Sequence, residues 1–105
     1  MLRIYSVALE VARDAARVAE RIQRRDPDLA RQLRRAAASV PLNLAEGSRA
    51  LGGNRRARYA DALGSACETR ACLEVAAAMG YTPEPQPLVL DRLARVIGTL
   101  VNLTR

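Results

Sequence analysis

The sequence predicts an all-α protein, an antiparallel up-down-up-down four-helix bundle. Glycines and prolines interrupt the 105-residue chain at three places and leave four long segments, in which apolar residues recur at helical spacing and no strand pattern competes. Half of the residues are hydrophobic, mostly Ala, Leu and Val, and three tyrosines are the only aromatic residues, which suits closely packed helices better than a sheet. Short connections make successive helices antiparallel. We expect one domain, residues 1–105, with helices at about 3–24, 27–50, 54–79 and 87–104.

The first helix has an unusually wide apolar face. One stripe consists of Ile4, Ala8, Val11, Ala15, Val18 and Ile22, and a second stripe beside it consists of Tyr5, Leu9, Ala12, Ala16 and Ala19. Together they cover about half of the circumference, against the roughly 100° expected of a helix that packs on one side. Either the alanines simply tolerate both environments, or one stripe contacts another subunit. We favour the second interpretation.

The second helix begins at Asp26-Pro27, a capping residue followed by a proline in the first turn. Its core stripe is predicted to be Leu29, Leu33, Ala36, Ala37, Val40 and Leu44. Pro41 lies inside this helix, where a proline removes one backbone hydrogen bond and costs about 3 kcal/mol. A helix that keeps such a residue indicates a specialised segment at residues 39–49.

The third helix is expected to begin with Asn54 as its N-cap and carries small residues on nearly all sides, including Gly64 and Ser65. Such residues let another backbone approach closely. We predict a structural polar network that fixes the register of the second and third helices, because buried polar groups persist when they are hydrogen-bonded to one another. Its members are Asn43, Glu46, Ser65 and Glu68. For Glu46, a local ion pair with Arg49 is the open alternative.

The fourth helix follows Gly80 and a proline-rich connection. One side of this helix is apolar and is expected to be plain core packing: Val89, Leu90, Leu93, Val96, Ile97, Leu100 and Val101.

The charge of the chain is strongly uneven. All 17 basic residues are arginines and the net charge is +6. Residues 1–58 hold 13 arginines against 6 acidic residues, whereas residues 59–105 hold 4 against 5. This asymmetry indicates an anionic partner. The candidate nucleic-acid contacts are Arg31, Arg34, Arg35, Arg49, Arg55, Arg56 and Arg58, with Arg24 and Arg25 behind them. The alternative is a solvated face with local pairs to Asp28 and Asp61.

Such contacts would bind phosphates, with an affinity that falls steeply as salt rises. The few aromatic residues argue against base stacking, and therefore against sequence-specific recognition of single strands.

Enzymatic function is not expected. The chain has no histidine, the commonest general base and metal ligand, and its carboxylates form no recognisable catalytic pair. The spacing of Cys67 and Cys72 matches no metal or redox motif. We therefore expect no catalytic residue, cofactor or metal. Free thiols, no signal peptide and no apolar run of roughly 18 residues favour a cytoplasmic protein without a membrane partner.

Three motifs carry a family resemblance: Ser39-Val-Pro-Leu-Asn-Leu-Ala-Glu-Gly-Ser, then Gly64-Ser65-x-x-Glu68, and Gly80-Tyr81. Over nearly its whole length the chain resembles the 23S ribosomal RNA intervening-sequence proteins. These are similar in turn to the accessory variability determinant of diversity-generating retroelements. The pattern departs at Leu44, where isoleucine is usual, and at Arg55 and Arg56, which make that end more basic.

The resemblance implies a four-helix bundle that assembles as a homopentameric barrel. For the retroelement relatives it implies binding of nucleic acid and of a reverse transcriptase through a basic surface. The expected partners are therefore further copies of the chain, RNA or DNA, and a reverse transcriptase or another protein. We expect a non-catalytic, homo-oligomeric protein that binds nucleic acid non-specifically. The alternative is a structural or protein-interaction scaffold without nucleic-acid binding.

Overall fold

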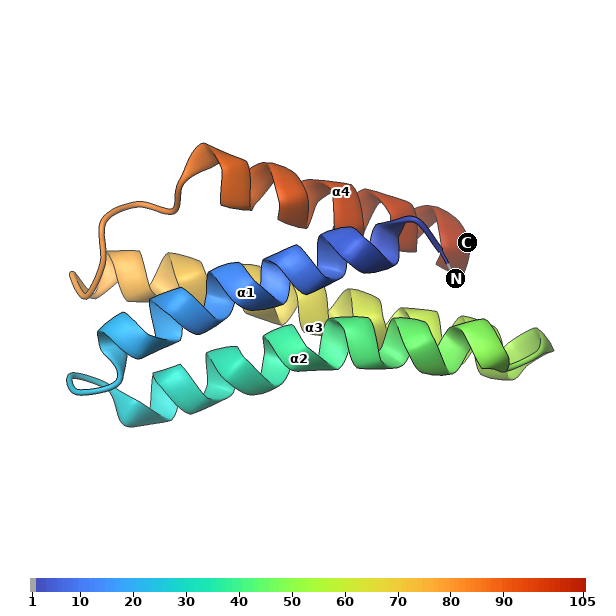
Figure 1. Ribbon diagram of the computed structural model, residues 1–105, viewed down its shortest axis with the longest axis horizontal. Helices are drawn as coiled ribbons and strands as arrows, with labels where there is room; N and C mark the ends of the chain where they lie inside the picture. The colour runs from blue at the N-terminus through green and yellow to red at the C-terminus, as the bar shows by residue number, and fades with distance from the viewer. Residues whose placement is uncertain (1) are drawn as a thin grey trace.

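The computed structural model describes residues 2–105 as four helices: α1 (Ile4–Ile22), α2 (Pro27–Arg49), α3 (Gly52–Ala78) and α4 (Pro87–Thr104). Consecutive helices run in opposite directions along a molecule with principal extents of 43 × 24 × 20 Å (Figure 1). The described residues contain no strand. The predicted all-α, up-down-up-down four-helix bundle is confirmed.

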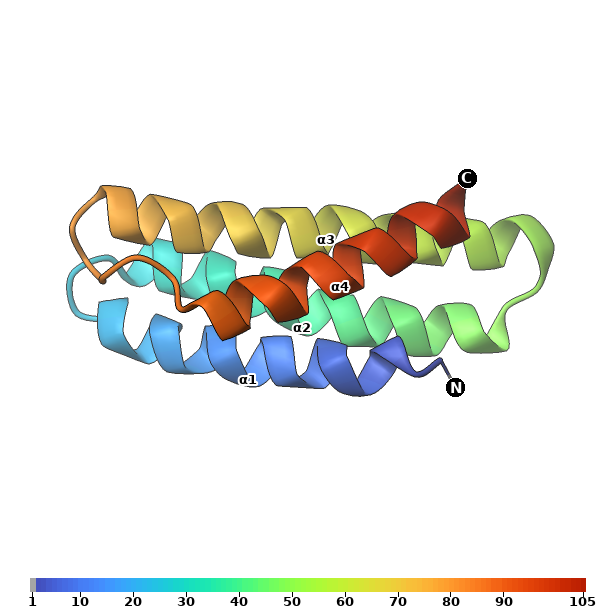
Figure 2. The same ribbon diagram turned by 90° about the horizontal axis from the view of Figure 1, so that it is seen from above.

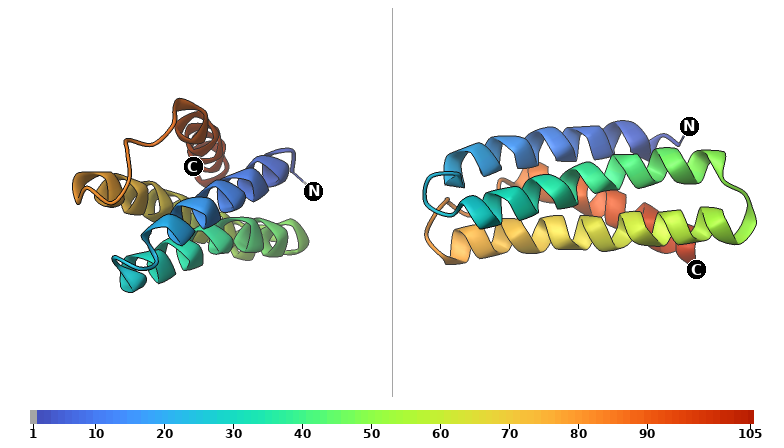
Figure 3. Two further views of the ribbon diagram at one scale, coloured as in Figure 1. Left: turned by 60° about the vertical axis from the view of Figure 1, so that its left-hand side comes forward. Right: turned by 90° about the horizontal axis from the view of Figure 1, so that it is seen from below.

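The helices differ in how closely they pack. α2 lies between α1 and α3, whereas α4 packs on α1 and α3 and, within residues 2–105, none of its Cα atoms comes within 8 Å of a Cα atom of α2. α4 also crosses the other helices obliquely (Figures 2 and 3). The prediction that Leu90 and Val101 belong to the core is wrong, because their exposed fractions are 37% and 38%. A helix that rests across its neighbours presents a narrower strip to the core.

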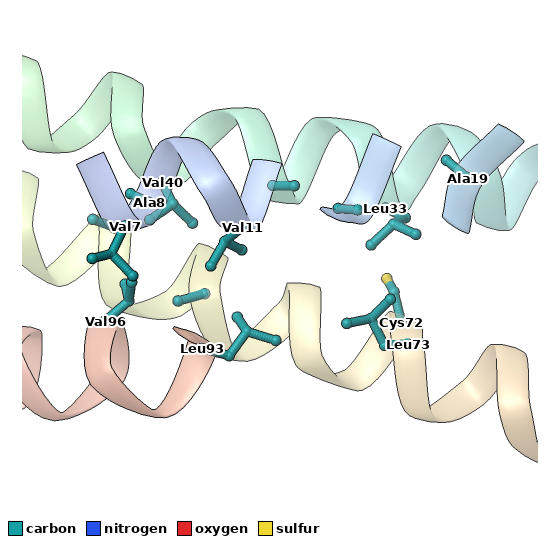
Figure 4. Packing of buried hydrophobic residues seen from close by; sticks show 14 of the residues in the cluster. Val7, Ala8, Val11, Ala19, Leu33, Val40, Cys72, Leu73, Leu93 and Val96 are labelled. Atoms are coloured by element: carbon teal, nitrogen blue, oxygen red, sulfur yellow. The ribbon is translucent and has the colours of Figure 1, made fainter. Parts of the chain in front are cut away.

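The buried residues form one cluster to which all four helices contribute (Figure 4). The core stripe predicted for α2 is buried throughout. The first stripe of α1 is buried as well, except for the half-buried Val18.

The second stripe of α1 is mostly used inside the bundle. Ala19 is fully buried and Tyr5, Leu9 and Ala12 are half-buried, which leaves Ala16 as its one exposed member. Because α1 packs against both α2 and α4, its wide apolar face follows largely from contacts within one chain.

The connection between α1 and α2 is set by Asp26. Its carboxylate oxygen Oδ1 accepts a hydrogen bond from the Leu29 N–H at 3.0 Å, and Pro27 occupies the first turn of α2. Immediately before it, the N–H groups of Arg25 and Asp26 donate to the Ile22 carbonyl. α1 therefore ends at Ile22, two residues before the predicted boundary.

The connection between α2 and α3 is shorter than predicted. α3 begins at Gly52 rather than Asn54, so Asn54 lies in its first turn and is not the N-cap. Gly52 has a φ of +59°, which residues with a side chain rarely adopt. Arg55 Nε donates to the carbonyls of Gly47 at 3.1 Å and Ala50 at 3.0 Å, and so satisfies acceptors at the end of α2.

The end of α3 is fastened to the α1–α2 connection. Gly80, with a φ of +77°, closes α3 together with a hydrogen bond from the Tyr81 N–H to the Ala76 carbonyl at 2.9 Å. The Tyr81 hydroxyl donates to Asp26 Oδ2 at 3.2 Å, and the Arg25 guanidinium lies 5.5 Å from the centre of the Tyr81 ring. Desolvation, followed by the negative charge of Asp26, raises the pKa of Tyr81. The Gly80-Tyr81 motif thus joins two connections at one end of the bundle.

Candidate nucleic-acid interface

The seven candidate arginines fall into two groups at opposite ends of α2. The first group is Arg31, Arg34 and Arg35, near the start of α2. The tip group is Arg49, Arg55, Arg56 and Arg58, around the α2–α3 connection. Arg31 and Arg49 are 18 residues apart in one helix, so their Cα atoms are about 27 Å apart. The structure therefore does not bring the seven side chains into a single cluster.

The first group remains open to solvent. Arg31 forms an ion pair with Asp28, and Arg34 donates to the Gln23 side chain. For Arg35, residues 2–105 provide no ion pair or hydrogen bond. The Arg31 and Asp28 side chains are 65% and 86% exposed, and such a pair contributes at most about 1 kcal/mol. The guanidinium groups can therefore bind a further anion at little cost.

The tip group has one member with a structural role. Arg55 is fixed on the end of α2 by its hydrogen bonds to two backbone carbonyls. Arg58 lies 3.9 Å from Asp61 in an exposed pair. Within the described chain, Arg49 and Arg56 make no ion pair or hydrogen bond. The predicted pairs with Asp28 and Asp61 thus exist, but both are solvent-exposed.

α1 carries three exposed arginines that the sequence reasoning did not include: Arg13, Arg17 and Arg21. Arg24, which was predicted to lie behind the candidate contacts, follows the end of α1 and continues their row, with spacings of four, four and three residues. This helical spacing places them on one side of α1 and could have revealed them. The Arg34 side chain contacts Gln23, directly beside Arg24, so the row on α1 continues into the first group.

The polar contacts between α2 and α3 centre on Ser39. Asn43 Nδ2 donates to both the carbonyl and the hydroxyl oxygen of Ser39 at 2.9 Å, and the Ser65 hydroxyl donates to Ser39 Oγ at 2.8 Å. Two of the four residues expected in the network, Asn43 and Ser65, are thus joined through the Ser39 hydroxyl. Ser39 itself was not among the predicted members.

The two glutamates predicted for the network lie outside this cluster. Glu68 is exposed and accepts from the Gln32 side chain at 3.5 Å. Glu46 is exposed too, and among residues 2–105 it is neither in the network nor paired with Arg49. Carboxylates at the helix surface are more favourably solvated by water than by a serine hydroxyl.

Gly47, in the same segment of α2, lies against the ring of the buried Tyr59. A Cβ atom at Gly47 would lie 2.4 Å from Tyr59 Cε1. Tyr59 is only 5% exposed, so its ring has little room to move. Gly47 is therefore required for the close approach of α2 and α3 near the tip group.

The charged contact between α1 and α4 involves Arg92. Its guanidinium donates to both carboxylate oxygens of the buried Asp14, at 3.0 and 2.9 Å, and pairs with Glu10 at 3.1 Å. The hydrogen bond to Asp14 raises the pKa of Arg92. A cavity of about 240 Å³ lies beside this contact, where the α3–α4 connection joins α4. The carboxylate of Asp14 at this cavity is engaged in holding α4 on α1.

The described residues provide no group of three or more His, Cys, Asp or Glu side chains that could hold a metal ion. Cys72 is buried, and desolvation, followed by the negative charge of Glu68, raises the pKa of its thiol. Across residues 2–105, none of the helices combines the length and apolar character needed to cross a membrane.

Among the comparisons with known proteins, one shows the family of the chain and another shows its fold. The family model described as "23S rRNA-intervening sequence protein" matches residues 1–102. The chain is also similar to a crystal structure from Bacteroides thetaiotaomicron, described as a protein of unknown function from the S23 ribosomal protein family. The identity is 19%, the TM-score is 0.85, and the match covers 97% of this chain and 98% of the other. No curated protein matches the chain.

Proposed function

This chain belongs to the 23S rRNA-intervening sequence protein family, and we propose that it is a non-catalytic, homo-oligomeric protein that binds nucleic acid through its exposed arginines. The observation that carries the proposal is the first group, which continues into the arginine row of α1. Together they give the end of the bundle around the α1–α2 connection a net positive charge, since residues 17–35 hold seven arginines against Glu20, Asp26 and Asp28. Such a surface neutralises phosphates and attracts their polymers.

The proposed binding is independent of sequence. Reading single-stranded bases relies largely on stacking them against exposed aromatic side chains. Tyr59 is buried, Tyr81 is hydrogen-bonded to Asp26, and Tyr5 is packed against the core. None of the three tyrosines therefore provides a stacking platform, which leaves phosphate contacts as the source of affinity.

Self-association is the second part of the proposal. The family resemblance implies a homopentamer, and several apolar side chains lie exposed at the end of α3 and on α4: Val75, Met79, Leu90, Val101 and Leu103. Exposed apolar surface is typical of interaction sites. Because linked weak sites bind together more tightly than one site alone, a ring of subunits would strengthen the contact with a long anionic polymer.

A titration of the purified protein with duplex DNA and with structured RNA tests the proposal. We expect binding at about 50 mM salt that weakens markedly at about 200 mM. Replacing Arg31, Arg34 and Arg35 by glutamine should weaken binding without unfolding the bundle. The matched control replaces the exposed Arg70, Arg95 and Arg105 by glutamine, which removes the same amount of charge outside the first group. Absence of binding at the lower salt would refute the proposal.

The second candidate is a scaffold that binds proteins only, and the same exposed apolar residues favour it. The retroelement resemblance makes a reverse transcriptase one possible protein partner. A self-associated protein that binds neither DNA nor RNA in the titration would support this candidate.

A further inference from the structure

The outward side of α2 is basic at its two ends and uncharged between them. Arg31 and Arg49 are 18 residues apart, five complete helical turns, and therefore project from the same side of α2. Ala38, Leu42 and Ala45 lie between them at helical spacing on this side. Leu42 is 65% exposed, so the middle of this side faces solvent.

Each end has an arginine with no partner in the described chain. Arg35 lies one turn from Arg31, and Arg56 belongs to the tip group with Arg49. The first group faces two acidic residues, Asp28, which pairs with Arg31, and Glu68 of α3, which lines the same surface hollow as Arg31 and Arg35. The four arginines of the tip group face Glu46, one turn before Arg49, and Asp61, which pairs with Arg58. Both ends remain net positive, with no basic residue on the outward side between them.

This spacing matches a wide groove of a nucleic-acid duplex. One turn of B-form DNA is about 34–36 Å long, and its two grooves are about 12 and 6 Å wide. By proportion the wide groove takes about two thirds of the turn, or about 23 Å along the axis. The Cα atoms of Arg35 and Arg49 are about 21 Å apart and those of Arg31 and Arg49 about 27 Å, which brackets this span.

We propose that α2 lies along a B-form duplex and straddles its wide groove, with its two basic ends on the two phosphate backbones. Ala38, Leu42 and Ala45 face the groove between them, where there is no phosphate to neutralise. This inference rests on the proposed nucleic-acid binding and adds to it the duplex as the partner and α2 as the element that lies against it.

Two hairpin DNAs that differ in the length of the duplex stem test the span. One stem has about 5 base pairs, or half a turn, and the other has about 16, or one and a half turns. One variant replaces Arg31 and Arg35 by glutamine, and another replaces Arg49 and Arg56. On the long duplex each variant should reduce the slope of log affinity against log salt by about 1.8, because two phosphate contacts are lost. The short duplex can bind only one basic end of α2 at a time. Either variant alone should therefore leave the salt slope on this duplex unchanged, because the unmodified end still binds.

Leu42→Glu tests whether the middle of α2 faces the DNA. A carboxylate there would meet the negative potential of the groove, and we expect at least a tenfold loss of affinity. Leu88→Glu is the matched control, because Leu88 is 56% exposed at the start of α4 and the charge change is the same. Light scattering must show an unchanged assembly mass for every variant.

The outcomes separate this inference from the proposed function. Equal effects of Leu42→Glu and Leu88→Glu, or equal salt slopes of the wild-type protein on the two hairpins, would overturn the groove-straddling contact while nucleic-acid binding stands. Tighter binding to A-form duplex RNA or to single strands than to the long DNA duplex would also overturn it. A wild-type protein that binds no nucleic acid would refute both.

Discussion

Gly47 is the glycine at which packing leaves the least freedom. It belongs to the motif that carries the family resemblance, and the ring of Tyr59 occupies the space where its side chain would be. The need for a glycine here comes from this contact between two helices. Its backbone conformation is an ordinary helical one.

Gly47→Ala should therefore destabilise the protein by about 1–3 kcal/mol, because overpacking displaces a buried ring. Gly64→Ala is the matched control: Gly64 lies inside α3 with no atom near its missing side chain, so alanine should stabilise by about 0.5–1 kcal/mol. Urea unfolding of the two variants measures both effects. A change of the same sign in both would contradict the packing described for Gly47.

The two thiols should differ in reactivity. Burial raises the pKa of Cys72, so less of its reactive thiolate is present at neutral pH, and its side chain is also less accessible than that of the half-exposed Cys67. We expect a thiol reagent such as a maleimide to modify Cys67 first in the folded protein. Mass spectrometry of Cys67→Ser and Cys72→Ser over time checks this order, and denaturant should abolish the difference.

Single residues were predictable where the signal is local. Asp26 and Gly80 mark a helix start and end through their own backbone preferences, and both do so in the structure. Ser39 was missed because its partner Ser65 lies 26 residues away on another helix. Similarly, sequence spacing gives no information on the carbonyls that Arg55 binds.

α4 is joined to α1 by a polar contact in addition to its apolar packing. It rests on two neighbours and contributes three fully buried side chains, Leu93, Val96 and Leu100. Arg92 adds hydrogen bonds to the carboxylate of Asp14, which is only 8% exposed. Because a buried carboxylate without a partner is costly, this contact should govern how often α4 opens.

Arg92→Gln should therefore speed amide hydrogen exchange in α4 more than in α2. The double variant Asp14→Asn with Arg92→Gln should recover part of the protection, since the uncompensated charge is gone. Arg95→Gln, an exposed change on the same helix, is the control. Equal exchange in the Arg92 and Arg95 variants would show that the contact does not hold α4.

The helices themselves were predictable because their starts and stops are coded by capping residues, glycines and prolines. Their bounds lie within two residues of the predicted ranges. The oblique crossing of α4 could not be predicted. The sequence pattern of its apolar side is the same whether a residue is buried in the core or lies partly exposed at the edge of the core. Leu90 and Val101 fall on that margin.

At the scale of the whole molecule, the arginines that are close in sequence are not all close in space. Residues 31–58 include most of α2 and the α2–α3 connection, so their arginines lie in two groups at opposite ends of α2. The uneven charge of the chain predicted an anionic partner. The spacing between the two basic ends of α2 follows only from the length of this helix and from the helical repeat that places Arg31 and Arg49 on the same side. The row on α1 completes one of these ends through the antiparallel packing of α1 on α2.

The mass of the assembly in solution tests the proposed self-association. With a chain of 11.4 kDa, a homopentamer should scatter light as a particle of about five times that mass. Replacing the exposed Leu90 and Val101 by serine should lower this mass if α4 contributes to the interface. A wild-type mass near that of one chain would refute self-association.

The salt dependence of binding to a duplex of about 16 base pairs tests the central claim most directly. If the arginines neutralise phosphates, log affinity should fall linearly with log salt, with a slope of about −0.9 for each phosphate contacted. The glutamine variants of the first group should show a shallower slope, and the Arg70, Arg95 and Arg105 control should keep the wild-type slope. No binding at about 50 mM salt, or an affinity that does not change with salt, would contradict the account.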